Sequence, residues 1–183
     1  MHLHTNNGAD GFGPHPKALQ AWYAVHVRSN FERRVTNELT GRGIETFLPA
    51  TNDLHQWKDR RKLVETPLFP GYTFARLCGT AENRLTVLRV LGVVRILGSE
   101  TEIEPIPDCE VDGIRRLIDA GGSLTVHPLL RESSTVRIKR GPLKSLEGSV
   151  IEVRNKIRLV VSLHLLGRSV STEIDADNAE LLH

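Results

Sequence analysis

The chain has 183 residues, 39% of them hydrophobic and 25% charged, a composition typical of a globular protein that excludes disorder along the whole length. Its longest nearly apolar run, residues 159–166, is far shorter than the roughly 20 residues that cross a bilayer, and its polar N-terminal segment is unlike a secretory signal, so we expect a cytoplasmic protein that does not contact the membrane. The net charge of +2 says little about partners, and only the local distribution of charge is informative.

Residues 1–19 are rich in Gly, Pro and Asn and are expected to form a disordered tail. The aromatic and β-branched run at 22–27 then predicts a strand. Ser29 and Glu32 have the spacing of a capping box. Apolar residues at every fourth position up to Leu39 predict a helix after this box.

Residues 44–48 predict a second strand, followed by a polar connection that contains the basic run 58–62. A turn leads into a strand, helix and strand over 72–97, and a last helix is predicted at 108–120. The order of elements over 20–121 predicts an α+β sandwich, in which the helices pack on one face of a mostly antiparallel sheet.

Residues 122–134 lack periodicity and are interpreted as a linker that contains a short strand near 124–127. Over 135–183 we expect only short strands separated by turns, an all-β pattern typical of a small barrel. This part is also basic, with eight Lys or Arg between 135 and 168, whereas 99–120 carries seven acidic residues. Charged runs are most often solvated faces, but several basic patches in a small protein also suit a polyanion or a ribonucleoprotein.

Catalytic chemistry is hard to find in this sequence. Residues 141–145 end like a phosphate-binding loop, but Leu143 replaces the glycine required before the lysine and a strand is predicted where a helix should follow. No nucleophile-elbow motif is present, and the histidines lack ligand spacing. Cys78 and Cys109 are too few for a zinc site. An enzyme is therefore the least favoured class, and we expect no catalytic residues, no metal and no cofactor.

Two pairs of stretches resemble a known family. Residues 22–25 (Trp-Tyr-Ala-Val) and 67–74 (Pro-Leu-Phe-Pro-Gly-Tyr-Thr-Phe) resemble the N-terminal (NGN) domain of NusG-type transcription elongation factors. Residues 137–144 (Arg-Ile-Lys-Arg-Gly-Pro-Leu-Lys) and 146–150 (Leu-Glu-Gly-Ser-Val) are similar to the KOW module of the same family. The stretch at 67–74 is specific to this family, whereas a KOW motif alone also occurs in ribosomal proteins.

The resemblance implies an α+β NGN domain at 20–121 and an SH3-like KOW barrel at 135–183. Residues 57–62 look more like the specialised, operon-recruited paralogs of the RfaH and UpxY kinds. Ser145 stands where many KOW modules have a glycine.

The family implies that the NGN domain binds the clamp helices of the largest RNA polymerase subunit through an apolar surface. Alternation along the strand at 72–77 places Thr73, Ala75 and Leu77 beneath the helices and leaves Tyr72, Phe74 and Arg76 on the uncovered face. The expected polymerase-binding residues are His26, Phe69, Pro70, Tyr72 and Phe74. From the residues alone, ordinary core aromatics are the simpler interpretation, and the resemblance favours a partner surface.

Further candidate sites concern nucleic acid and the barrel. The family implies that the helix face with Arg33, Arg34 and Arg42 lies near the non-template DNA strand. Lys58, Arg60, Arg61 and Lys62 are a second candidate for DNA or a polymerase loop. The barrel is expected to bind the termination factor Rho or a ribosomal protein through Leu165, Leu166 and Arg168, and a barrel this basic could instead contact RNA.

The hypothesis that follows is a monomeric elongation factor that promotes processive transcription and antitermination at selected operons. One alternative is a general family member that acts in elongation and in Rho-dependent termination. Another is a KOW-type protein that binds RNA or the ribosome.

Overall fold

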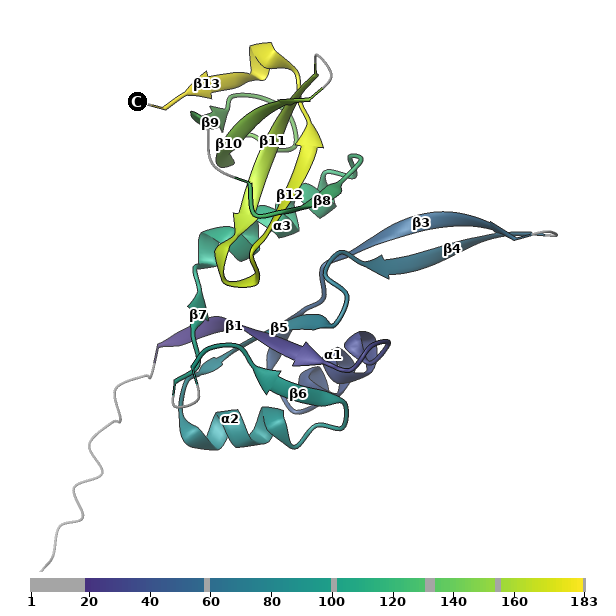
Figure 1. Cartoon of the computed structure of the whole chain (residues 1–183), viewed down its shortest axis with the longest axis vertical. Coiled ribbons are helices and arrows are strands. Elements are labelled where there is room, and N and C mark those ends of the chain that lie inside the picture. Colours follow the sequence, from purple (N-terminus) through teal and green to yellow (C-terminus); the bar gives the residue numbers. More distant parts are fainter. Residues whose placement is uncertain (1–18, 58–59, 100–101, 131–133, 154–155, 183) are drawn as a thin grey trace, which may run out of the picture.

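The computed structural model describes residues 19–57, 60–99, 102–130, 134–153 and 156–182, with the side chains of 53–64 and 153–156 also outside the description. The predicted tail, apart from Leu19, thus lies outside the described residues. Figure 1 shows an N-terminal unit with helices and a separate all-β unit, with a helix between them. None of the described helices is long and apolar enough to cross a membrane.

The N-terminal unit is built on an antiparallel sheet. Its central strand, β1 (Gln20–Val27), pairs with β5 (Tyr72–Cys78) on one side and with β6 (Val93–Ile96) on the other. β2 (Glu45–Phe47) extends the sheet beyond β5, and the short β7 (Pro105–Ile106) also pairs with β1. The predicted α+β architecture with an antiparallel sheet is therefore confirmed.

One face of this sheet carries α1 (Glu32–Gly41) and α2 (Ala81–Leu88). A hydrophobic cluster joins alternate residues of β1 and β5 to both helices, with Ala75 and Leu77 among its members. Thr73 is buried on the same face, where its hydroxyl lies 2.8 Å from that of Thr36 on α1. The predicted orientation of these strand residues is confirmed.

The other face carries α3 (Asp108–Asp119), so the prediction that the helices share one face is wrong for this helix. Trp22, Ala24 and Phe74 of the sheet belong to one cluster with Val111, Ile114 and Leu117 of α3. The same cluster continues into the all-β unit that follows, which we call the barrel. The periodicity of α3 shows that the helix is amphipathic. It does not show that the apolar residues of α3 pack against both the sheet and the all-β unit.

The predicted polar connection forms a long hairpin instead. β3 (Ala50–Trp57) and β4 (Arg60–Pro67) pair antiparallel along their whole length, and the hairpin projects from the N-terminal unit in Figure 1. An isolated two-stranded ribbon has no buried face over most of its length, so its sequence need not alternate between apolar and polar residues.

The all-β unit is a six-stranded antiparallel sheet with the order β13-β9-β10-β11-β12-β8. The strands are β8 (Thr125–Pro128), β9 (Ser134–Ile138), β10 (Glu147–Val153), β11 (Lys156–Leu163), β12 (Arg168–Glu173) and β13 (Ala179–Leu181). Short 3-10 turns, η1 (His164–Leu166) and η2 (Ala176–Asn178), complete it. The predicted all-β unit is confirmed. The strand expected inside the linker, β8, pairs with β12 and so belongs to this unit.

Candidate functional site

The turn between β4 and β5 is held from two sides. The amide of Tyr72 donates to the carbonyl of Phe69 at 3.0 Å, and the amide of Val27 on β1 donates to the carbonyl of Gly71 at 2.8 Å. Gly71 has a φ of +83°, a left-handed conformation that favours glycine. These bonds fix the positions from which Phe69 and Tyr72 extend.

Glu32 of α1 adds a third support to this turn. Its carboxylate Oε1 accepts a 2.8 Å hydrogen bond from the amide of Gly71, and the residue is 6% exposed. The predicted capping box is wrong, because α1 begins at Glu32 without a side-chain cap. Asn30 has a φ of +66°, a left-handed conformation in the segment between Ser29 and Glu32 that the capping box would have joined. A buried carboxylate needs such a donor, so the contact is a structural requirement of the turn.

His26 and Tyr72 form the accessible part of the predicted polymerase-binding surface. They are paired across β1 and β5, and their rings stack with centroids 5.2 Å apart at an angle of 29°. Both side chains are partly exposed, and Pro70 beside them is exposed. Three of the five predicted residues therefore remain open to a partner.

Phe69 and Phe74 are not on an open surface. They are 4% and 1% exposed, and their rings meet edge to face with centroids 6.2 Å apart. The expectation that Phe74 lies on an uncovered face is wrong in this arrangement, because the cluster around α3 and the barrel covers it. We call Trp22, Phe47, Phe69, Tyr72 and Phe74 the aromatic face, since all five join this cluster or pack against it.

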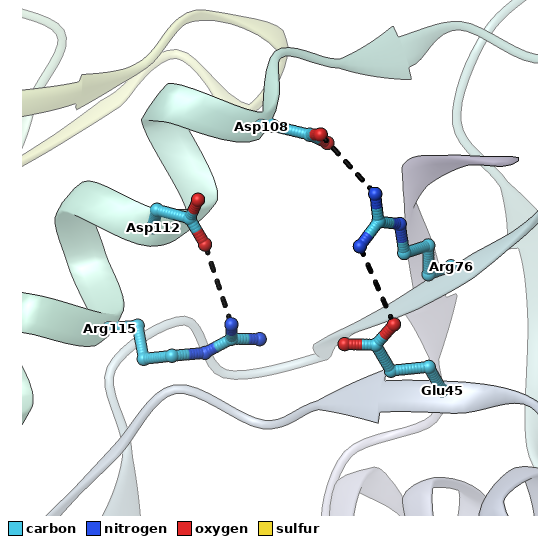
Figure 2. A network of polar contacts seen from close by, with 5 residues as sticks. All are labelled: Glu45, Arg76, Asp108, Asp112 and Arg115. Carbon is cyan, nitrogen blue, oxygen red and sulfur yellow. Dashed lines mark hydrogen bonds and ion pairs between the residues drawn. The ribbon is translucent and has the colours of Figure 1, made fainter.

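Charged side chains lie between α3 and the edge of the sheet formed by β2 and β5 (Figure 2). Arg76 of β5 lies 3.4 Å from Asp108 at the start of α3 and 3.6 Å from Glu45 of β2. Arg115 and Asp112 pair within α3 at 3.4 Å. These groups are substantially exposed, so each pair contributes only about 0.2–1 kcal/mol. Of these pairs, Arg76 with Asp108 joins α3 to the sheet, whereas Arg115 with Asp112 lies within the helix.

The two arginines of this network also cover aromatic rings. Arg115 lies 5.5 Å from the ring of Trp22 and 5.0 Å from that of Phe47, and Arg76 lies 5.9 Å from Trp22. Trp22 and Phe47 were not among the site residues predicted from the sequence. The sequence could have indicated Trp22, because Trp22 and His26 are four residues apart on β1 and alternation places both on the same face of the sheet.

The predicted barrel site meets the same region from the other side. Leu165 and Leu166 in η1 are partly buried against the cluster that contains the aromatic face. Next to them, Nδ1 of His164 lies 2.8 Å from Oε1 of Glu110 on α3, and the amide of His164 donates to the second carboxylate oxygen at 3.2 Å. Arg168 is exposed. The two surfaces that the sequence assigned to different partners thus meet around α3.

The predicted nucleic-acid residues are only partly described. Arg33 and Arg34 are exposed on α1, where Arg33 pairs with Glu65 and Arg34 lies 5.6 Å from the ring of Phe31. Arg42 donates to Glu38 at 2.6 Å and to the carbonyl of Thr86 on α2 at 3.0 Å. Lys58 lies outside the described residues. The backbones of Arg60, Arg61 and Lys62 lie in β4, but their side chains are also outside the description.

Comparison with known proteins identifies the family. The family model described as "Transcription termination factor nusG" matches residues 20–115, more than half of the chain. The chain belongs to the NusG family. The resemblance found in the sequence is therefore confirmed at the level of the family.

Relatives in the NusG family align over nearly the whole chain. The Escherichia coli O6:H1 protein is 31% identical over 176 residues, which cover 87% of this chain and 94% of that protein. The protein of Halalkalibacterium halodurans is 25% identical over 172 residues, which cover 87% of this chain and 97% of that protein. Both are named transcription termination/antitermination protein NusG.

A solved structure shows the same fold. The structure titled "Domain interaction in Thermotoga maritima NusG" superimposes with a TM-score of 0.53 at 21% identity and covers 90% of this chain and 98% of that chain. At this level of identity the superposition shows a shared fold and says nothing about a shared function. It agrees with an N-terminal α+β unit followed by a β-barrel.

Proposed function

We propose that this chain is a transcription elongation factor that works by staying attached to RNA polymerase. The N-terminal unit binds the clamp helices of the largest subunit, bridges the main cleft and disfavours the open states that precede pausing. The observation that carries the proposal is the stacked, partly exposed pair His26 and Tyr72 at the border of the aromatic face. No bond is made or broken in this mechanism.

The chemistry of the aromatic face suits such a partner. Aromatic side chains at the centre of an interface contribute most of its binding energy, and truncating one anchor typically costs about 2 kcal/mol or more. Tyr72 and His26 stand on a turn and strand that Glu32, Gly71 and Val27 hold rigid. A preorganised surface loses little side-chain entropy when a helix docks on it.

The buried position of Phe69 and Phe74 adds a condition to the proposal. A partner gains these two rings only after part of their cover moves away. We take the barrel as the part that moves, because α3 begins directly after β7, which is paired with β1, whereas none of the described strands of the barrel is paired with that sheet. If the open form has a fraction f of the population, the apparent dissociation constant rises by the factor 1/f.

The remaining predicted sites fit the same proposal. Arg33 and Arg34 on the exposed side of α1 are suited to the phosphates of the non-template strand. Leu165, Leu166 and Arg168 of the barrel bind a ribosomal protein or Rho once the barrel is free. The factor acts in the cytoplasm as a monomer, and it serves selected operons.

A general role in elongation and Rho-dependent termination is the second candidate. The names of the relatives, which combine termination and antitermination, support it. Occupancy of the factor along the genome separates the two roles. Binding at nearly all transcribed genes would support the general role and exclude the operon-specific one.

Binding of the full-length chain to core RNA polymerase tests the proposal. We expect Tyr72→Ala and His26→Ala to weaken binding by about tenfold or more. Leu181→Ala serves as the matched control, because Leu181 is 59% exposed on β13 of the barrel. A folded Tyr72→Ala variant that binds polymerase as tightly as the wild type contradicts the proposal.

A further inference from the structure

The connection between α3 and the barrel is shorter than the sequence predicts. The sequence places a linker at 122–134, but β8 (Thr125–Pro128) within this range is a strand of the barrel. α3 ends at Asp119, and Ala120 follows as its C-cap residue. Only residues 121–124 therefore separate the cap of α3 from the first strand of the barrel.

Backbone bonds attach β8 and the residues after it to the barrel. β8 pairs antiparallel with β12 over its whole length, and it lies along β12 in Figure 1. The amide of Leu129 donates to the carbonyl of Gly167 at 2.8 Å, and the amide of Leu130 donates to Oγ of Ser169 at 3.1 Å. The chain thus stays bonded to the edge of the barrel for two residues beyond β8.

A network of side chains strengthens this attachment. Ser171 of β12 is 0% exposed, and its hydroxyl lies 2.9 Å from Nε2 of His127 on β8. Arg158 of β11 donates to the hydroxyl of Ser171 at 3.1 Å and to that of Thr125 on β8 at 2.9 Å. Detaching β8 from β12 would remove His127 and Thr125 from this network. Such a loss is unfavourable, because a buried polar group without its partner is costly.

The contact between β8 and the N-terminal unit is less complete. Leu124 and Val126 pack against the cluster around α3, but both are only partly buried. They line a cavity of about 510 Å³ together with Thr51 and Pro67 from the base of the β3–β4 hairpin. A cavity of this size marks incomplete packing, since protein interiors leave few voids larger than a water molecule. β8 is therefore bound more firmly to the barrel than to the N-terminal unit.

Two glycines occupy the segment between the units. Gly121 has a φ of +69°, and among the described residues nothing beyond its chain neighbours lies within 4 Å of the position of a Cβ. At Gly122 a Cβ would lie 2.8 Å from Oγ1 of Thr172 in the barrel. Glycine adopts many backbone conformations, and a few residues at the end of an element are enough to absorb a domain movement. The segment is therefore suited to act as a hinge.

We propose that the barrel leaves the N-terminal unit together with β8, on a short hinge at Gly121 and Gly122. This inference rests on the proposed function, in which the barrel uncovers the aromatic face. An extended chain from Ala120 to Thr125 spans at most about 18 Å, against about 50 Å if β8 were detached and the chain were free up to Ser134. The barrel thus stays close to the polymerase-bound N-terminal unit, and its second partner has to bind beside that unit.

A disulfide between β8 and β12 tests whether the two strands stay together. Val126 and Val170 are directly opposite each other, and neither side chain belongs to the network around Arg158. The background carries Cys78→Ser and Cys109→Ser. We expect oxidised Val126→Cys with Val170→Cys to bind core RNA polymerase as tightly as the same variant after reduction. Binding at least about tenfold weaker in the oxidised form overturns the proposal, because β8 would then have to detach.

Hydrogen exchange followed by mass spectrometry gives an independent measurement on the free wild-type chain. We expect peptides that cover 125–130 to be protected to the same degree as peptides that cover β12, because the two strands open together. We expect the hinge at 121–124 to exchange faster. Exchange over 125–130 as fast as that of the hinge would show that β8 detaches readily, and it overturns the proposal.

Lengthening the hinge tests how short it is. A flexible insert of 12 Gly and Ser residues between Gly121 and Gly122 lengthens the segment from four residues to 16. The effective concentration of a tethered group falls roughly as the −3/2 power of the tether length, so the barrel competes less and polymerase is expected to bind about eightfold more tightly. If β8 were detached, the same insert would lengthen a segment of 13 residues to 25, and the gain would be less than about threefold. A gain of that size or smaller overturns the proposal.

Two controls accompany the insertion. The same insert at the C-terminal end of the sequence is expected to leave the affinity for polymerase unchanged. Tyr72→Ala is expected to weaken binding with and without the hinge insert. If Tyr72→Ala binds normally, the proposed function fails, whereas a normal effect of Tyr72→Ala without a gain from the insert refutes the short hinge alone.

Discussion

Glu110 of α3 and His164 of the barrel join the two units of the chain directly. The carboxylate of Glu110 contacts the ring Nδ1 of His164 at 2.8 Å and accepts the amide of the same residue at 3.2 Å. Leu165 and Leu166, which follow His164, pack on the cluster that covers Phe69 and Phe74. The arrangement that buries the aromatic face therefore also occupies the turn by which the barrel is proposed to bind its own partner.

A disulfide between α3 and β11 is expected to hold the chain in this arrangement. A Cβ on Gly113 would lie 2.8 Å from Cγ1 and 3.5 Å from Cγ2 of Val161, so the two positions face each other across the contact between α3 and β11. They are therefore neighbours at which a pair of cysteines can be introduced. We expect Gly113→Cys with Val161→Cys, in a background with Cys78→Ser and Cys109→Ser, to bind polymerase at least about tenfold more weakly when oxidised. Titration of the oxidised protein against core polymerase measures this.

The same variant after reduction is the control for that measurement, since it has the same sequence without the bond. We expect dithiothreitol to restore binding. Equal affinity in the oxidised and reduced forms would show that polymerase binding does not require the barrel to leave.

A larger residue at Gly113 is expected to have the opposite effect. Gly113→Leu places a side chain where Val161 already lies, so the barrel is pushed away from α3. Leucine is a better helix former than glycine, so α3 itself is retained. We expect tighter binding to polymerase and faster hydrogen exchange at the η1 turn. Unchanged exchange at η1 together with unchanged affinity would contradict this expectation.

The strands and their faces could be predicted because a strand has a period of two. The pattern from Tyr72 to Leu77 correctly assigned Ala75 and Leu77 to the face beneath α1 and α2. The burial of Phe74 could not be predicted, because Phe74 is covered by α3 and the barrel, which come later in the chain. The stripe of α3 shows that the helix is amphipathic, but nothing local shows that it packs between the sheet and the barrel.

Contacts between distant residues explain the other differences. Ser29 and Glu32 have the right spacing for a capping box, yet Glu32 bonds to Gly71, 39 residues away. The hairpin of β3 and β4 was predicted as a polar connection, because a two-stranded ribbon outside the sheet need not alternate between apolar and polar residues. The binding roles of His26, Tyr72 and Arg33 remain predictions. They depend on partners that neither the sequence nor the fold contains.

Loss of the Glu32 carboxylate is expected to destabilise the turn that carries the aromatic residues. Glu32→Ala leaves the partly buried amide of Gly71 without its acceptor, a loss that costs about 1–3 kcal/mol for a fully buried donor and less where water reaches the donor. Glu32→Gln keeps an acceptor oxygen and is the matched control, for which we expect a smaller loss. Urea denaturation followed by circular dichroism measures both. Equal stability of the alanine variant and the wild type would show that water replaces this contact.

Glycine in place of Ser145 is expected to stabilise the barrel. Ser145 has a φ of +66°, and its amide donates to the carbonyl of Ile138 at 2.7 Å, so the left-handed conformation is fixed by the turn. A residue with a Cβ is disfavoured there by roughly 1–2 kcal/mol, part of which glycine loses again through its greater freedom in the unfolded chain. We therefore expect Ser145→Gly to raise the free energy of unfolding of the barrel by up to about 1 kcal/mol in chemical denaturation. Gly141→Ala, at a φ of +84° in the same turn, is the complementary variant and is expected to lower it. If both variants unfold at the wild-type midpoint, the turn does not adopt the left-handed conformation at these positions in solution.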